Sequence, residues 1–112
     1  MRERLLREAL QAARRLIEAL EEQGIRVEEA YLFGSRVRGD ALEHSDADLV
    51  IVSDAFQGMR YTDRLELIYR IEAKLHTHPF IEAIPLTREE LRERLREPTM
   101  LRDAARYWTR LR

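Results

Sequence analysis

Apolar side chains recur at three- and four-residue intervals through residues 2–23, with arginine and glutamate between them. These positions are Leu6, Leu10, Ala13, Ile17 and Leu20. The interval is that of one face of an α-helix, so the pattern predicts an amphipathic helix. Gly24 follows directly, and glycine is a common residue at a helix C-terminus. We therefore expect the helix to end there.

Three short apolar runs further along the chain predict β-strands. They cover residues 27–33, 47–53 and 80–86, and they are rich in branched and aromatic side chains. Such side chains favour strands, and the runs have the length of strands rather than of buried helices.

Two further segments predict helices. Residues 61–76 return to helical spacing, and their apolar side chains lie near one face. Those side chains are Leu65, Ile68, Ile71 and Leu75. Thr87 and Glu90 then form a capping-box pattern that predicts the start of another helix, which Pro98 ends or kinks.

The last segment, residues 99–112, is also interpreted as helical. Its apolar side chains would form a stripe along one side: Met100, Leu101, Ala104, Tyr107, Trp108 and Leu111. An apolar helix face usually packs against the parent core. Packing on the protein's own sheet and binding of a partner protein are both open for this stripe.

The predicted order of elements is helix, strand, loop, strand, helix, strand, helix, helix. Three strands flanked by helices indicate an α+β fold with a small mixed β-sheet, covered on at least one face. A chain of 112 residues and 13.3 kDa has the size of one domain, so we expect a single domain over residues 1–112.

Charge and composition exclude several kinds of protein. The net charge of -1 gives no overall attraction to nucleic acid or to an anionic membrane, so any anion site must be local. The absence of cysteine excludes disulfides, thiolate nucleophiles and cysteine-ligated metals. No stretch approaches the roughly 18 apolar residues of a membrane span, and the charged N-terminus lacks a signal-peptide pattern. We expect a cytoplasmic protein.

Asp46 and Asp48 stand at the start of the second predicted strand. Side chains alternate along a strand, so the two carboxylates point the same way. Two like charges side by side are relieved by a raised pKa on one of them or by a shared metal ion. Oxygen ligands alone favour magnesium or manganese over zinc. The alternative is a solvated strand entry after the turn-forming residues that precede Asp46.

Glu82 is the one charge in the otherwise apolar third strand. A buried carboxylate is costly unless it is paired or binds a metal. If the second and third strands are neighbours, Glu82 could join Asp46 and Asp48 in a site for one or two divalent ions, as in phosphoryl or nucleotidyl transfer. A charged edge strand with one wet face is the alternative.

Gly34 and Ser35 follow the first predicted strand and could open a short helix over residues 36–41. Backbone N–H groups and the Ser35 hydroxyl would then form an anion site, and glycine would let a phosphate approach closely. Arg36 and Arg38 either add positive charge beside a triphosphate or are solvated.

Residues 34–49, GSRVRGDALEHSDADL, resemble a known family. The Gly-Ser pair, ten intervening residues and Asp-x-Asp are the pattern of the DNA polymerase β-like nucleotidyltransferase superfamily. The Arg38-Gly39 pair and the Ser-Asp before the second aspartate make the chain most similar to its minimal nucleotidyltransferase group. The rest of the chain resembles the family in its order of elements.

The resemblance implies a nucleotidyltransferase fold and transfer of a nucleotidyl group, AMP from ATP, with two magnesium ions bound and manganese as a substitute. Gly34 and Ser35 would bind the triphosphate, with Arg36 and Arg38 beside it. Asp46 and Asp48 would bind metal. Glu82 stands where the superfamily usually has an aspartate, and it would be the third catalytic and metal-binding acid.

The resemblance also implies a partner. Relatives of this size often pair with a small helical protein of the HEPN type, and some are antitoxins that adenylylate it. Because larger relatives carry extra domains, the substrate pocket here would come from such a partner or from a homo-oligomer. The alternative function, left open by the longer side chain of Glu82, is a catalytically weak nucleotide-binding antitoxin or interaction module that acts by direct contact.

Overall fold

The computed structural model describes residues 2–112, which form a mixed β-sheet with helices on both sides. In chain order the elements are α1 (Arg2–Glu22), β1 (Glu29–Phe33), α2 (Ser35–Arg38), β2 (Ala47–Val52), η1 (Asp54–Phe56), α3 (Tyr61–Leu75), β3 (Ile81–Leu86), α4 (Arg88–Arg96), α5 (Met100–Ala104) and β4 (Thr109–Arg110). The predicted α+β fold is confirmed.

The sheet has the strand order β3-β2-β1-β4. Strand β2 is antiparallel to β1 and parallel to β3, and β4 is antiparallel to β1. Asp48 is in register with Phe33 on one side and with Glu82 on the other. The first residues of β2 therefore lie between the end of β1 and the start of β3.

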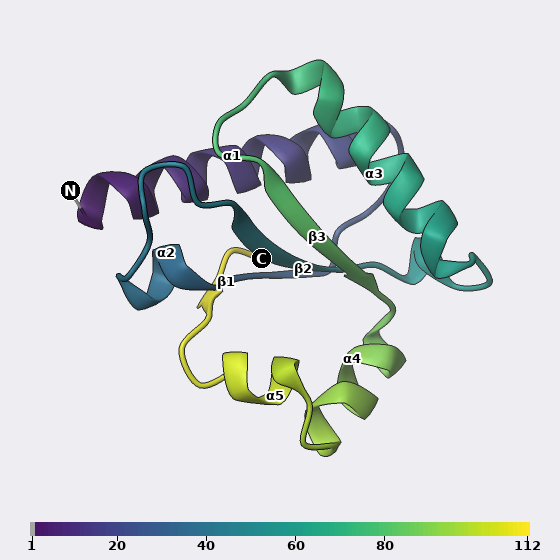
Figure 1. Ribbon diagram of the computed structural model, residues 1–112. Coiled ribbons are helices and arrows are strands. Elements are labelled where there is room, and N and C mark those ends of the chain that lie inside the picture. Colours follow the sequence, from purple (N-terminus) through teal and green to yellow (C-terminus); the bar gives the residue numbers. More distant parts are fainter. Residues whose placement is uncertain (1) are drawn as a thin grey trace.

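Helices α1 and α3 cover one face of the sheet, and α4 and α5 cover the other (Figure 1). The main core under α1 and α3 includes Leu16, Leu32, Leu49, Ile51 and Ile81. A smaller core under α4 and α5 includes Tyr31, Val50, Leu86, Leu91 and Leu101. Because side chains alternate along a strand, Asp48 lies on the same face as Val50, the side of the smaller core.

The predicted helices over residues 2–23 and 61–76 are confirmed as α1 and α3. The capping box at the start of α4 is also present. The Thr87 hydroxyl accepts a hydrogen bond from the Glu90 N–H at 3.2 Å, and the Glu90 carboxylate accepts one from the Thr87 N–H at 2.8 Å. The local sequence signals were sufficient for these elements.

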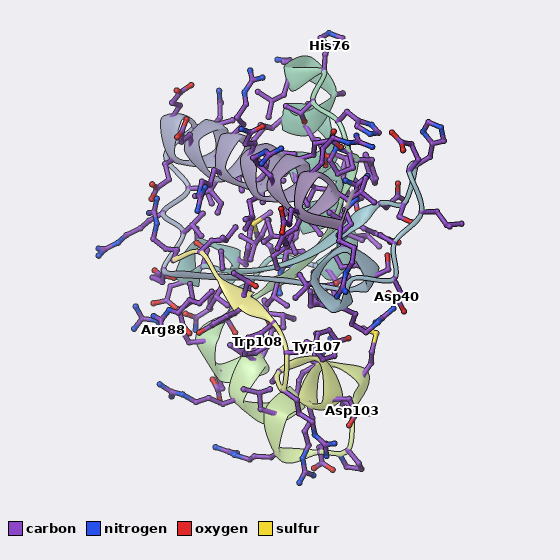
Figure 2. The ribbon with its side chains drawn as sticks, turned by 90° about the vertical axis from the view of Figure 1, so that its left-hand side faces the viewer. Asp40, His76, Arg88, Asp103, Tyr107 and Trp108 are labelled. Atoms are coloured by element: carbon purple, nitrogen blue, oxygen red, sulfur yellow. The ribbon has the colours of Figure 1, made fainter. Side chains whose placement is uncertain are left out.

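The prediction that residues 99–112 form one helix is wrong. The helix α5 ends at Ala104, and Thr109–Arg110 forms a fourth strand beside β1. Figure 2 shows Tyr107 and Trp108 on the connection between these two elements. Aromatic and β-branched residues favour strands, and Trp108 stacks on Tyr31 with ring centroids 4.1 Å apart.

The supposed apolar stripe is consequently divided between several surfaces. Leu101 and Ala104 are buried in the smaller core, and Trp108 packs against it. Leu111 packs against the main core instead, and Met100 is exposed. Most of these side chains therefore pack on the protein's own sheet.

Strand β3 is an edge strand, and α3 covers part of its outer edge. The Ile81 N–H donates a hydrogen bond to Glu72 Oε2 at 2.6 Å, and the Ala83 N–H donates one to the Tyr69 hydroxyl at 3.3 Å. Both N–H groups face away from β2, because alternate residues of a strand point to opposite neighbours. Helix side chains thus bind backbone groups that a further strand would otherwise pair with.

The same helix binds the far end of β3 through Arg64, a buried residue. Pro85 has no N–H to donate, and its carbonyl accepts a hydrogen bond from Arg64 Nη1 at 3.1 Å. The guanidinium also forms a salt bridge with Glu90 at 2.6 Å. Arg64 therefore links α3, β3 and the first turn of α4.

Glu72 makes the stability of the fold dependent on pH. Its side chain is buried, and its Oε1 atom has no hydrogen-bond partner among the described residues. Burial raises the pKa of Glu72 to about 7, opposed by the hydrogen bond from Ile81 and assisted by the charge of Asp46. The native state thus keeps a proton that the unfolded chain releases near its ordinary pKa of 4.5.

We expect Glu72→Gln to flatten the pH dependence of stability. The free energy of unfolding of the wild type should fall between about pH 4.5 and pH 7, because the native state holds more protons than the unfolded chain there. Glutamine mimics the protonated acid and should be more stable than wild type at about pH 8 by on the order of 2 kcal/mol. Urea unfolding of both proteins at about pH 4.5 and pH 8 tests this prediction. An equal change in the free energy of unfolding of wild type and Glu72→Gln between these pH values would contradict it.

Candidate active site

Gly34 lies against the carboxylate of Asp48. It ends β1 with φ of 94° and ψ of -165°, a conformation that favours glycine. A Cβ atom at this position would overlap Asp48 Oδ2. The first residue of the Gly-Ser pair and the second aspartate of Asp-x-Asp are therefore in direct contact, although thirteen residues separate them in the sequence.

Three carboxylates influence one another at the start of β2. Asp48 is half-buried, whereas Asp46 and Glu82 are exposed. Burial, a hydrogen bond between the Asp48 and Glu82 carboxyl groups, and the charges of Glu82 and Asp46 together raise the pKa of Asp48 to about 6. Asp48 therefore holds a proton below about pH 6 in the absence of a cation.

This set of side chains has the chemistry of a divalent metal site. Within residues 2–112, no group of three His, Cys, Asp or Glu side chains already has the arrangement of a complete metal site. Asp48 and Glu82 are nevertheless in contact, and the exposed Asp46 lies just before β2. Carboxylate oxygens suit Mg²⁺ or Mn²⁺, and such an ion would offset the like charges of these side chains.

Ser35 begins α2 directly after Gly34. The Gly34 carbonyl accepts hydrogen bonds from the N–H groups of Val37 and Arg38 at 3.1 and 3.0 Å. Gly39 ends the helix in a left-handed conformation with φ of 92°, and its N–H donates to the Ser35 carbonyl at 2.9 Å. The expected short helix after the Gly-Ser pair is thus present, with Ser35 at its N-terminus beside the carboxylates.

Arg36 is buried and serves the protein's own structure. Its guanidinium donates to the carbonyls of Ser45 at 2.9 Å and Glu43 at 3.3 Å, both in the loop before Asp-x-Asp. It also donates to the Leu5 carbonyl at 2.8 Å and to Glu8 Oε2 at 3.4 Å, both in α1. Its donors are therefore used inside the fold, which does not fit the expected contact with a nucleotide.

Arg38 is the predicted arginine that lies near the carboxylates. Its charge lowers the pKa of Asp48, against the larger effects that raise it. Its exposed guanidinium donates to the Tyr107 hydroxyl at 3.0 Å and pairs with Asp40 at 3.4 Å; Tyr107 and Asp40 are both labelled in Figure 2. Arg38 can therefore approach an anion beside Asp48 from the protein surface.

A largely apolar hollow of about 370 Å³ adjoins the Asp48–Glu82 pair. It is lined by Phe33, Asp48, Tyr61, Leu65, Tyr69, Glu82, Ala83, Ile84 and Met100. It extends beside Asp48 from Phe33 of β1 to Ala83 and Ile84 of β3. A larger hollow of about 560 Å³ is lined mainly by residues of η1 and α4, at the far end of β2 from the carboxylates.

Three polar residues of α3 that bind β3 were missed in the sequence: Arg64, Tyr69 and Glu72. Tyr69 and Glu72 lie near this site, and Arg64 lies at the far end of β3. Arg64 and Glu72 lie four residues on either side of the buried Ile68, so both occupy its buried stripe. A charge on the apolar stripe of an amphipathic helix is the signal that could have identified them. Tyr69 gave no such signal.

Comparison with known proteins identifies a family for this chain and structures that resemble it. Residues 13–103 match the family described as nucleotidyltransferase domain. A crystal structure from Sulfolobus solfataricus, of a protein inferred to be a nucleotidyltransferase, is 28% identical with a TM-score of 0.56 and covers 82% of this chain and 75% of its own. BolA1 from Arabidopsis thaliana is similar in fold alone, with 22% identity and a TM-score of 0.51 over 70% of this chain and 94% of its own. No curated protein sequence matches this chain.

Two glycine substitutions test whether the Gly34–Asp48 contact shapes the site. Gly34 and Gly58 both have positive φ, but a Cβ atom at Gly58 would meet no atom within 4 Å. Alanine at either position should cost about 1–3 kcal/mol of stability from backbone strain. Gly34→Ala alone should also displace the Asp48 carboxylate and weaken Mn²⁺ binding by about tenfold or more.

Calorimetric titration with Mn²⁺ and urea unfolding of both variants make this comparison. Equal Mn²⁺ affinities for Gly34→Ala and Gly58→Ala would show that the contact does not position Asp48.

Proposed function

Because this chain belongs to the nucleotidyltransferase domain family, we propose that it transfers AMP from ATP to a hydroxyl group of a protein acceptor in the presence of Mg²⁺. The observation that supports this most directly is the position of Asp48. It contacts the Gly34 backbone on one side and the Glu82 carboxyl on the other. A phosphate-binding turn and a pair of acidic ligands thereby adjoin each other.

Asp46, Asp48 and Glu82 would bind the Mg²⁺ ions. Bound Mg²⁺ offsets the charge of the triphosphate and of the leaving pyrophosphate. Asp48 is held by its contact with Gly34, whereas Asp46 and Glu82 are exposed and can turn toward a ligand. Burial and Glu82 raise the pKa of Asp48 to about 6, so a metal ion would compete with a proton for Asp48 below about pH 6.

The triphosphate would lie at the start of α2. The first N–H groups of a helix have no partner within the helix. The absence of a side chain at Gly34 leaves room for the Asp48 carboxylate, which therefore lies beside these N–H groups. The Ser35 hydroxyl adds a further donor. Arg38 supplies the positive charge, since its exposed guanidinium lies near Asp48. Arg36 supports this turn from within the fold.

The acceptor would enter through the apolar hollow that Asp48 and Glu82 line. Its hydroxyl oxygen attacks the α-phosphorus, the bond from this phosphorus to the bridging oxygen of the β-phosphate breaks, and pyrophosphate leaves. Glu82, as a carboxylate, takes the hydroxyl proton. In this arrangement the leaving pyrophosphate would lie at the Gly34 turn, and the acceptor hydroxyl would lie beside Glu82.

The proposed acceptor is a helical partner of the HEPN type, and the proposed role is that of an antitoxin in the minimal nucleotidyltransferase group. Support comes from the Gly-Ser, ten-residue, Asp-x-Asp pattern and from the hollow beside Glu82. Tyr61 and Met100 line this hollow and belong to the exposed large apolar side chains. They would contact an apolar surface around the acceptor residue.

Radiolabel transfer tests the proposed reaction. Wild-type protein with Mg²⁺, ATP labelled on its α-phosphate and a HEPN-type candidate partner should label the partner and release pyrophosphate. Asp48→Asn should reduce the rate by a factor of about 100 or more, because it removes a negative ligand from the site. Asp54→Asn is the matched control, since Asp54 is an exposed aspartate just beyond the far end of β2.

Binding of ATP with Mg²⁺ but no labelled product, across several candidate partners, would contradict the enzymatic function. It would favour the alternative, a nucleotide-binding antitoxin that acts by direct contact. Retention of transfer by Asp48→Asn would contradict the assignment of the site.

A further inference from the structure

We propose that α3 holds Glu82 in position by binding both backbone amides that flank it, which makes Glu72 and Tyr69 positioning residues for the metal site. This inference rests on the proposed function, because it assigns Glu82 to the metal ions. Neither residue would touch the reacting atoms. Each would act through the backbone of β3.

Glu82 needs such support because of its place in the sheet. It lies on an edge strand, its side chain is exposed, and it is one methylene longer than aspartate. A free edge has unpaired backbone groups and less restraint than a central strand. A misplacement of about 1 Å at a reacting centre can lower a rate by about a hundredfold.

The two amides next to Glu82 are bound by side chains of one helix. The Ile81 N–H donates to Glu72 Oε2 at 2.6 Å, and the Ala83 N–H donates to the Tyr69 hydroxyl at 3.3 Å. Between them lies the Cα atom from which the Glu82 side chain extends. The helix therefore fixes the strand immediately before and immediately after the acid.

The opposite side of β3 is fixed by β2. The Phe80 carbonyl accepts a hydrogen bond from the Ala47 N–H at 3.0 Å, and Glu82 is in register with Asp48. The backbone N–H and C=O groups of even-numbered residues in β3 thus point toward β2, and those of odd-numbered residues point toward α3. Glu82 is held between a neighbouring strand and a helix that substitutes for one.

Tyr69 has a second connection to the site, because it lines the hollow that contains Asp48 and Glu82. Its ring also packs against Phe80, with centroids 5.4 Å apart, one residue before β3 begins. Burial and the charges of Glu82, Glu72 and Asp48 raise the pKa of Tyr69, against the hydrogen bond from Ala83. Its hydroxyl group is therefore within electrostatic range of these carboxylates.

Mn²⁺ titration of α3 variants, followed by electron paramagnetic resonance, tests the inference. Glu72→Leu and Tyr69→Phe each remove one acceptor from β3 and should weaken Mn²⁺ binding by about tenfold. Glu72→Gln keeps an oxygen for the Ile81 N–H and should bind Mn²⁺ within about twofold of wild type. Leu67→Ala is the control for stability, because Leu67 lies on α3 and packs against the main core but has no polar group to bind a β3 amide.

Amide hydrogen exchange provides a readout that does not need the metal. The Ile81 amide should exchange faster in Glu72→Leu, and the Ala83 amide faster in Tyr69→Phe, while Leu67→Ala changes neither selectively. If Glu72→Leu fails to fold, Tyr69→Phe still gives both measurements.

The positioning role would be overturned if Tyr69→Phe and Glu72→Leu bound Mn²⁺ as tightly as wild type. It would also be overturned if Leu67→Ala lost as much Mn²⁺ affinity as they do. Either result would leave the metal site itself intact. Failure of the wild type itself to bind Mn²⁺ would overturn the proposed function and this inference with it. Amide exchange in that case would still report whether α3 holds the strand.

Discussion

The Asp48 carboxylate lies against the backbone of Gly34, and the rest of the site depends on this contact. It arises because β2 lies between β1 and β3, so the start of β2 adjoins both the end of β1 and the start of β3. A side chain at position 34 would displace the carboxylate. The contact joins a turn suited to phosphate with an acid suited to a divalent cation, as nucleotidyl transfer requires.

Buried charged side chains support this arrangement from both flanks. Arg36 ties the loop before Asp46 to α1 through backbone carbonyls. On the other flank, Arg64 and Glu72 tie α3 to the edge of β3. A buried charge is tolerated when it is hydrogen-bonded, and removing a partner then leaves costly unpaired groups. Buried polar contacts therefore support both the loop that leads to Asp46 and the edge strand that carries Glu82.

The central strand, the Gly-Ser turn and the acidic residues were predictable, because Gly34 and Asp48 belong to a local pattern in the sequence. The role of Arg36 was not, since its partners include Leu5, which is distant in sequence. The contacts of Glu72 with β3 likewise depend on how α3 packs. The strand at Thr109 was missed because the apolar residues around it have helical spacing, whereas Thr109 and Arg110 pair with β1 and Trp108 stacks on Tyr31. Local sequence signals identified the glycine and the acidic residues of the site. The residues that hold them in place act through tertiary contacts, which the local sequence does not show.

A crystal structure with Mn²⁺ and a non-hydrolysable ATP analogue tests the central claim most directly. Anomalous scattering would locate the manganese without reference to any assumed site. We predict manganese peaks at coordination distance from the carboxylates of Asp46 and Asp48, with Glu82 turned toward them and the triphosphate on the Gly34–Ser35 turn. A nucleotide bound elsewhere, or manganese away from Asp48, would contradict the account.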